Sequence, residues 1–346
     1  MIVLYILSVI FIISPFLPAT ELPHWFFRTA DFVRLQSIFI EVVLLIVVAI
    51  LAPEYTVWVW IVLGGLLAAI LYQTVKVFKY SSFFPRKKPS FPHNGKISLL
   101  AANVLQDNRD YNAFISEINN YDPDLVLTME SDSGWEEGIK EIEKKYPHTI
   151  KAPNEQYYGM HLYSKKEIKG ASIRYLVEDI VPSIQFEYNI TEDISVYFEC
   201  LHPAPPSPTE NETSKERDAE LMIVAKKIRE RNEPTVVCGD MNDVVWSRVT
   251  RMFKKMTNMI DPRIGRGFFS TYHADYWFMR FPLDHLFHTK DLFVGRMERT
   301  KNFGSDHFGM YYEIHHKKKA TVKTKTKLDA DDREFVDEIM DRMEQA

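Results

Sequence analysis

Residues 236–247 read VVCGDMNDVVWS, and this stretch decides how the second part of the chain is interpreted. The apolar run over 235–238 is typical of a buried strand, which a plain turn should follow. Instead the run leads through Gly239 to Asp240 and Asn242, so a carboxylate and a carboxamide lie two residues apart. Taken alone, Gly-Asp is an ordinary turn dipeptide. The significance of this one therefore depends on whether other strands end in the same way.

Polar side chains recur where other predicted strands end. The positions at a strand end or in a neighbouring loop are Asn103, Glu130, His202, Asp240, Asn242, Asp284, Asp306 and His307. Each of them alone is explained by a cap or a turn. Together they would converge at one edge of a sandwich, an arrangement that turns alone do not explain.

The order of the predicted elements favours an α/β fold. Strands are predicted over 97–103, 125–130, 160–164, 183–190, 194–202, 235–238, 282–288, 292–297 and 307–314. Helices are predicted over about 111–118, 134–145 and 214–231, between groups of strands. This mixed order indicates an α/β sandwich in preference to a strictly alternating parallel sheet.

A sharp change of composition divides the chain near residue 80. We predict a membrane region over 1–80, a Pro-rich linker over 81–95, a catalytic domain over 96–316, and a basic tail with an amphipathic helix over 317–346. The membrane region contains apolar segments over 2–17, 35–52 and 55–77, and a span needs about 20 apolar residues. The segment over 2–17 lacks the basic start of a signal peptide, so a retained span is favoured.

Charge near the segments predicts their orientation. With three spans, the loop after the first and everything after the third lie on one side, and that side carries Arg28, Arg34, Lys76, Lys79, Arg86, Lys87 and Lys88. The positive-inside bias therefore places the catalytic domain in the cytoplasm. Glu41 lies within the second segment, either as a carboxylate near the interface or in a helix contact, or as a functional intramembrane acid.

The residue types at the strand ends suit hydrolysis of a phosphate ester. Asn103, Glu130 and Asp306 offer the hard oxygen ligands that Mg²⁺ or Mn²⁺ prefer. Asp240 and Asn242 can orient a water molecule and hold a phosphate oxygen. The histidines can act as acid, base or charge stabiliser, and Asp284 can fix the tautomer of one of them.

Zinc and disulfide chemistry are not indicated. The chain has two cysteines, Cys200 and Cys238, both within apolar strand-like runs, where buried free thiols are expected. No Cys/His tetrad suits structural zinc. The formal net charge of −5 argues neither for nor against a nucleic-acid partner.

The motifs GDMN, GSDH, PLDHLF, NVLQDN, TMES and LHPAP resemble those of the endonuclease/exonuclease/phosphatase superfamily, over about residues 96–315. The resemblance implies a four-layered α/β sandwich and a Mg²⁺-dependent phosphoesterase. The stretch FPLDHLF departs from the PAWCDR signature of inositol polyphosphate 5-phosphatases, which counts against that branch.

The resemblance also implies roles for single residues. Asn103, Glu130 and Asp306 match the metal-side positions, and His202 matches a histidine near the scissile phosphate. Asp240 and Asn242 match the GDxN pair. His307, oriented by Asp284, matches the catalytic histidine that contacts the phosphate. Either Asp240 or His307 would activate the water.

The predicted function is therefore a membrane-anchored phosphodiester hydrolase, nuclease-like in its site. Arginines close in sequence to the motifs favour a polyanionic substrate: Arg263, Arg266, Arg280, Arg296 and Arg299. The alternatives are a sphingomyelinase-like lipid phosphodiesterase, a phosphatase of a small substrate, and a non-catalytic binding member. The basic tail either contacts anionic lipid or nucleic acid, or links the domain to a docking helix.

Overall fold

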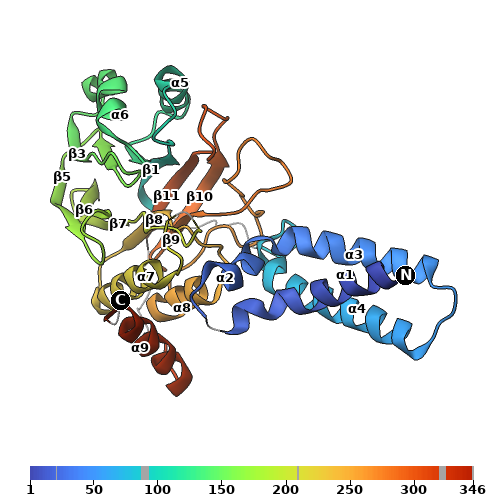
Figure 1. The fold of residues 1–346 in the computed structure, drawn as a ribbon. Coiled ribbons are helices and arrows are strands. Elements are labelled where there is room, and N and C mark those ends of the chain that lie inside the picture. The colour runs from blue at the N-terminus through green and yellow to red at the C-terminus, as the bar shows by residue number, and fades with distance from the viewer. Residues whose placement is uncertain (21, 87–92, 209, 319–324, 345–346) are drawn as a thin grey trace.

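The computed structural model describes residues 1–20, 22–86, 93–208, 210–318 and 325–344 (Figure 1). Part of the predicted linker and part of the predicted basic tail, over 87–92 and 319–324, lie outside the described residues. A long helical bundle projects from one side of a compact mixed domain, and the N-terminus lies in the bundle.

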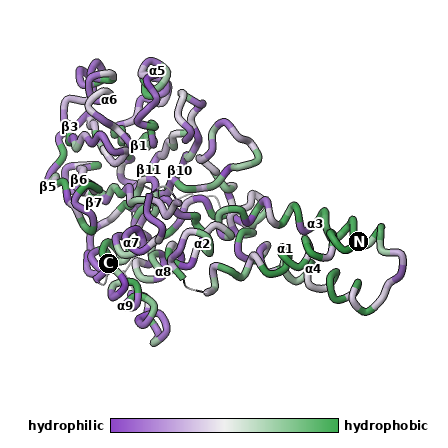
Figure 2. The backbone as a smooth tube through the Cα atoms, in the orientation of Figure 1, coloured by the Kyte–Doolittle hydropathy of each residue, from purple (hydrophilic) through white to green (hydrophobic). Residues whose placement is uncertain are grey.

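The bundle consists of the apolar helices predicted from composition. It contains α1 (Ile2–Ile13), which continues into a 3₁₀ turn (Ser14–Thr20), α3 (Arg34–Leu51) and α4 (Val57–Val77). By length and composition, three helical segments, Ile2–Thr20, Arg34–Leu51 and Val57–Tyr80, are suited to cross a membrane. Figure 2 shows that these helices are the most continuously hydrophobic part of the chain. Glu41 lies at the contact of α3 and α4, where its carboxylate accepts a hydrogen bond from Gln73 at 2.7 Å.

Two mixed sheets form the core of the domain. The first has the order β10-β11-β1-β2-β4-β3, and the second has the order β5-β6-β7-β8-β9. The strands are β1 (His93–Asn103), β2 (Leu125–Met129), β3 (His148–Ala152), β4 (Met160–Ser164), β5 (Ile168–Tyr175), β6 (Pro182–Thr191), β7 (Ile194–Cys200), β8 (Thr235–Asp240), β9 (Asp284–His288), β10 (Leu292–Arg299) and β11 (Met310–Lys317). Their inner faces bury one continuous apolar cluster.

Helices cover the outer face of each sheet. The helix α5 (Tyr111–Tyr121), α6 (Ser133–Gly138) and a 3₁₀ turn (Lys140–Lys144) cover the first sheet, while α7 (Lys215–Glu230) and α8 (Arg248–Thr257) cover the second. The C-terminal helix α9 (Ala330–Glu344) packs on α7. The result is a four-layered α/β sandwich, as the resemblance implied. Two helices escaped prediction, namely α8 and the short α2 (Trp25–Phe32).

Local sequence explains these elements. In β6, residues 184–191, IQFEYNIT, alternate between buried and more exposed positions, as a strand with one buried face requires. The helix α5 begins after Asp110, whose carboxylate accepts a hydrogen bond from the backbone N–H of Ala113 at 3.1 Å. It ends at Asp122 in the left-handed conformation, which closes the last turn.

Strand direction gathers the polar strand ends at one edge. In each sheet the central pair is parallel, β1 with β2 and β7 with β8, so the carboxyl ends of each pair point the same way. The next strand, β9, runs antiparallel to β8 and begins where β8 ends, so Asp284 lies opposite Asp240. Asp284, which begins β9, and Asp240, which ends β8, thus lie at the same edge of the sheet.

The bundle is seated directly on the domain. A cluster of apolar side chains joins Val77 and Tyr80 to Val245, Trp246 and Phe281 of the domain. The indole Nε1 of Trp246 donates to the backbone oxygen of Asp31 at 2.8 Å. These contacts join α2 and the end of α4 to the loops that follow β8.

The C-terminal helix α9 is expected to contribute to domain stability. Phe335 is 3% exposed, and the Arg248 guanidinium lies 4.0 Å from its ring centroid. Replacing Phe335 by Ala should lower the free energy of unfolding by about 3 kcal/mol, because a cavity replaces the ring. Thermal unfolding of the full chain in detergent measures the effect. Glu338→Ala, which removes only a surface pair with Arg342, is the control; equal shifts in the two variants would contradict the packing argument.

Candidate active site

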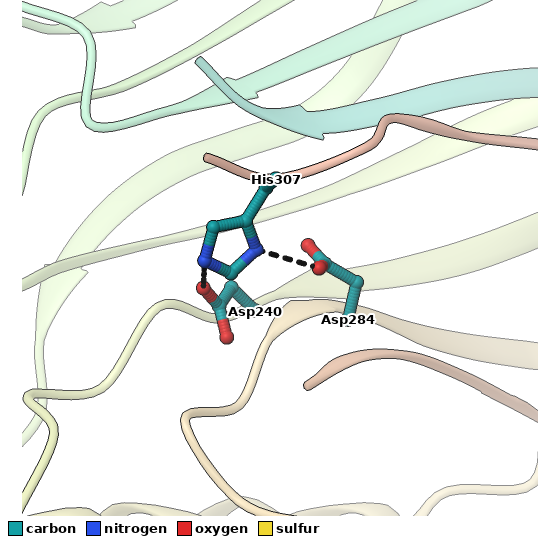
Figure 3. A group of neighbouring side chains, drawn as sticks. All are labelled: Asp240, Asp284 and His307. Atoms are coloured by element: carbon teal, nitrogen blue, oxygen red, sulfur yellow. Dashed lines mark hydrogen bonds and ion pairs between the residues drawn. The ribbon is translucent and has the colours of Figure 1, made fainter. Parts of the chain in front are cut away.

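A buried histidine lies between two carboxylates at the shared edge of the sheets (Figure 3). His307 Nδ1 is 2.9 Å from Asp284 Oδ2, and His307 Nε2 is 3.6 Å from Asp240 Oδ2. Burial alone would lower the pKa of His307, but the two carboxylates raise this pKa to about 10. Ligand atoms of the three residues lie within 4.8 Å of one another. Both ring nitrogens of His307 thus already face a carboxylate.

The turn after β8 is held in one conformation. The carboxylate of Asp240 accepts a hydrogen bond from the backbone N–H of Asn242 at 3.0 Å, and the Asn242 amide donates to Pro203 O at 2.9 Å. Gly239 has φ +137°, and a Cβ there would lie 1.9 Å from Leu201 O. Only glycine lets the strand approach β7 so closely just before the carboxylate.

Glu130 and Asn103 lie at the ends of the other parallel pair. The Asn103 amide nitrogen donates to Glu130 at 2.7 Å and to Asp240 at 3.2 Å, and its oxygen accepts from Leu105 N at 3.0 Å. Asn103 therefore meets both carboxylates through its nitrogen. Burial raises the pKa of Glu130 to about 7, and the charges of Asp306 and Asp240 act in the same direction, whereas the Asn103 hydrogen bond opposes it.

This set of oxygen donors fits a hard divalent cation. Glu130 and Asp306 line the same cavity, and each is a carboxylate of the kind that Mg²⁺ and Mn²⁺ bind. Carboxylates gathered in a buried place repel one another, and a cation between them would compensate for that repulsion and for lost hydration.

The loop that carries Asp306 and His307 is tied to β1 by a serine that our sequence reasoning did not single out. The Ser305 hydroxyl donates to Asn103 O at 2.9 Å and accepts from the backbone N–H of His307 at 3.0 Å. Ser305 belongs to the GSDH motif, which is the sequence feature that could have identified it. Ser305 thus sets the position of the two functional residues that follow it.

His202 lies on the second sheet's side of the same site. It is buried, and its Nδ1 has no hydrogen-bond partner among the described residues. Burial lowers the pKa of His202 to about 4, although Asp240 acts in the opposite direction. A neutral imidazole is therefore placed beside the cavity.

A cavity of about 410 Å³ brings the predicted residues together. Its lining includes Glu130, His202, Asp240, Asn242, Asp306 and His307. Asn103 and Asp284 do not line the cavity. Asn103 contacts Glu130 and Asp240, and Asp284 contacts His307. Tyr157 and Tyr158, which the sequence left between ordinary packing and a contact with phosphate, also line the cavity. The rest of its apolar and aromatic wall was not predicted and consists of Phe32, Leu105, Pro205, Pro206, Tyr272, Phe281 and Leu283.

Strained backbone is concentrated at this cavity. Seven non-glycine residues of the described chain have positive φ, and those that line the cavity are Leu105, Glu130, Tyr157 and Asn242. Such conformations cost about 1–3 kcal/mol each and persist where the surroundings impose them. Residues with strained backbone are typically found at functional sites, and these four lie at the cavity wall.

The arginines that favoured a polyanionic substrate are engaged elsewhere. None of the five lines the cavity. Their partners are Asp261 for Arg263, Gly295 O for Arg266, Ala274 O for Arg280, Glu298 for Arg296 and Ser270 O for Arg299. Proximity in sequence did not place them at the site.

A four-layered sandwich with an acidic, histidine-bearing cavity at the strand ends defines a phosphoesterase type of architecture. Residues 96–307 match the model of the Endonuclease/Exonuclease/phosphatase family, which is more than half of the chain. The chain therefore belongs to this family, whose members hydrolyse phosphoric esters with a divalent metal ion. No curated protein matches the sequence.

Solved structures share the fold at low sequence identity. D. rerio TDP2 complexed with a single-strand DNA product is 16% identical, with a TM-score of 0.54, and the match covers 64% of this chain and 99% of that one. A Beutenbergia cavernae endonuclease/exonuclease/phosphatase is 16% identical, with a TM-score of 0.54, covering 69% and 76%. The human nocturnin catalytic domain with bound sulfate is 15% identical, with a TM-score of 0.51, covering 65% and 96%.

Two glycine substitutions separate close approach from backbone strain. Gly239 and Gly267 have similar φ values of +137° and +127°, but a Cβ at Gly267 meets nothing closer than 3.8 Å. Gly239→Ala should therefore lower the thermal midpoint of the full chain in detergent considerably more than Gly267→Ala. Equal losses would show that the approach of Gly239 to Leu201 O does not constrain the turn.

Proposed function

We propose that the protein is a membrane-anchored, divalent-metal-dependent hydrolase of phosphodiesters. The observation that carries this proposal is His307, held between Asp284 and Asp240 at the wall of a cavity that Glu130 and Asp306 also line. Of the polar positions expected from the sequence, six line one cavity, and Asn103 and Asp284 contact those residues. This favours a catalytic protein over one that only binds a phosphorylated ligand.

Glu130 and Asp306 would hold the metal ion, with Mg²⁺ proposed and Mn²⁺ as an alternative. Asn103 would keep the Glu130 carboxylate in position through its amide nitrogen. When bound, the ion supplies a positive charge that polarises a phosphoryl oxygen.

The remaining residues would handle the water, the phosphate and the leaving group. A water oxygen forms a bond to phosphorus, one P–O ester bond breaks, and the leaving oxygen takes up a proton. Asp240 would accept the proton of the water, because His307, the rival candidate, already carries a proton between its two carboxylates and would instead stabilise negative charge on the phosphate. Asn242 would hold a phosphate oxygen. Asp284 would orient His307, and the neutral His202 would lie near the leaving group.

Anchoring by the N-terminal bundle forms part of the proposal. Three helical segments have the length and composition of membrane spans, and the domain lies at one end of the bundle. The positive-inside bias of Lys76, Lys79 and the neighbouring basic residues supports a cytoplasmic domain.

The sequence favoured a nuclease-like substrate preference. The fold shared with D. rerio TDP2, which was solved with a DNA product, is consistent with that preference. The five arginines give no support for a polyanionic substrate, because each of them contacts a group of the protein outside the cavity. The alternatives are a sphingomyelinase-like lipid phosphodiesterase and a phosphatase acting on a small phosphorylated substrate.

A small soluble diester tests the activity and the metal ligand. The full chain in detergent should hydrolyse bis(p-nitrophenyl) phosphate with Mg²⁺ or Mn²⁺, and a chelator should abolish the reaction. Glu130→Gln should raise the half-saturating metal concentration by about 10-fold or more, because a carboxylate ligand is lost. Glu137→Gln, at an exposed position, is the control. Chelator-resistant turnover, or an unchanged metal requirement in Glu130→Gln, would refute the proposed site.

The carboxylate behind His307 should affect turnover more than substrate binding. Asp284→Asn removes the charge that faces His307 Nδ1, and should lower kcat by about 10²- to 10⁴-fold with a smaller change in KM. Steady-state kinetics with the same diester measure this, and circular dichroism checks the fold. Asp193→Asn, on an exposed turn, should change neither constant. A kcat within 3-fold of the parent in Asp284→Asn would remove Asp284 from the mechanism.

A further inference from the structure

The proposed membrane region supplies part of the cavity wall. Phe32, the last residue of α2, lines the cavity beside Phe281 and Leu283 of the domain. Its ring lies 6.1 Å from that of Phe281, centroid to centroid, at an interplanar angle of 75°. The cavity is thus built at the junction between the domain and the bundle, so the protein binds its substrate beside the proposed anchor.

The charge of the cavity does not suit a polyanion. Within the described part of the chain, no Lys or Arg lines the cavity, whereas Glu130, Glu210, Asp240 and Asp306 do. Proteins that bind nucleic acid place Lys and Arg on successive phosphates. A cavity with carboxylates at one end and aromatic and proline side chains around them suits a single phosphodiester attached to an apolar group.

Large apolar side chains are exposed next to this junction. The loop before β9 exposes Tyr276, Trp277, Phe278 and Met279, and Trp277 is 79% exposed. The same loop contacts the first turn of α3, where the Gln36 amide donates to Phe278 O at 2.9 Å. Tyr272 and Phe281, on either side of the four exposed residues, line the cavity.

The loop over 276–279 lies level with the first turn of α3, at the end of the proposed spans that faces the domain. Other exposed aromatic residues lie in segments close to the domain end of the bundle, namely Phe16, Phe26, Phe78 and Phe83. In water such a group of side chains would be costly, whereas aromatic residues are enriched where helices leave the bilayer. The loop over 276–279, which we call the aromatic loop, continues this belt toward the cavity.

We propose that the cavity takes lipid phosphodiesters directly from the bilayer surface, with the aromatic loop inserted in the interface. This inference rests on the proposed activity and on the proposed anchoring. The phosphate and headgroup would enter the cavity past Phe32 and Phe281, while the acyl chains stay in the bilayer. Water adds to phosphorus and one P–O ester bond breaks, which yields a phosphomonoester and an alcohol.

An activity comparison tests the substrate class. The full chain is reconstituted in vesicles of phosphatidylcholine, phosphatidylethanolamine and phosphatidylglycerol, and lipid hydrolysis is followed by mass spectrometry. Single-stranded DNA and bis(p-nitrophenyl) phosphate are assayed with the same vesicles. The double variant W277S/F278S should lower the ratio of lipid to soluble-diester turnover by at least 10-fold. Tyr175→Ser should leave this ratio unchanged, because Tyr175 is an exposed aromatic residue of β5, a strand that lies across the domain from the bundle (Figure 1).

The outcomes separate this inference from the proposed function. Lipid hydrolysis that depends on the aromatic loop supports the inference. Cleavage of DNA but not of lipid, with normal turnover of the soluble diester, overturns the inference and leaves the proposed function standing. An unchanged ratio in W277S/F278S also overturns it. Failure to hydrolyse any of the three substrates overturns the proposed function itself.

A measurement that needs no turnover tests insertion of the loop. Both native cysteines are buried, so Trp277→Cys and Tyr175→Cys each offer one accessible thiol for an environment-sensitive dye. In vesicles the dye at position 277 should show a blue-shifted emission and be quenched by brominated lipids, and the dye at position 175 should show neither effect. Identical spectra at the two positions would place the aromatic loop in water and overturn the inference.

Discussion

The contact of His307 with Asp284 and Asp240 joins segments that are far apart in the sequence. Asp240 ends β8, Asp284 begins β9, and His307 belongs to the loop before β11. Burying three ionisable side chains is costly unless their charges compensate one another. An imidazolium between two carboxylates meets this condition. Asn103 links this group to Glu130, because its amide nitrogen donates to both Asp240 and Glu130. The site is thus one network that bridges the two sheets.

This network explains which parts of the site were predictable from sequence. Asn103, Glu130 and Asp240 end strands of parallel pairs, and parallel strands bring their carboxyl ends to one edge whatever the loops between them do. Asp284 was predictable because it interrupts an apolar stretch. The α/β sandwich followed from the same reading of strands and helices, and the four layers from the family resemblance.

Other features depend on contacts that no local pattern encodes. The wall formed by Phe32 requires α2 to pack on a loop about 250 residues away, as the Phe32–Phe281 contact shows. The arginines near the motifs were misleading for a related reason. Position in the sequence does not fix the direction of a side chain, and Arg263, for example, is buried against Asp261. The helix α8 does carry a local signal that was not used: Ser247 caps its start, and its buried residues Val249, Met252, Phe253 and Met256 recur at helical spacing.

The helical bundle and the turn after β8 are connected by side-chain contacts as well as through the chain. Arg217 of α7 donates to the backbone oxygen of Asn242 at 2.7 Å and binds Asp218 through two nitrogen atoms, at 3.0 and 2.7 Å. Arg28 of α2 lies 3.9 Å from the same Asp218. Arg217 and Asp218 are both buried, so their charges depend on each other and resist separation.

Together with the apolar cluster around Trp246, the contacts of Arg217 and Arg28 fix the orientation of the cavity relative to the bundle. A domain on a flexible tether could turn its cavity in any direction. Here the turn that carries Asp240 and Asn242 is held by Arg217 of α7, whose partner Asp218 also faces Arg28 of α2, so the fold sets the orientation of the cavity relative to the bundle. Phe32 of α2 therefore ties the cavity wall to the proposed membrane region.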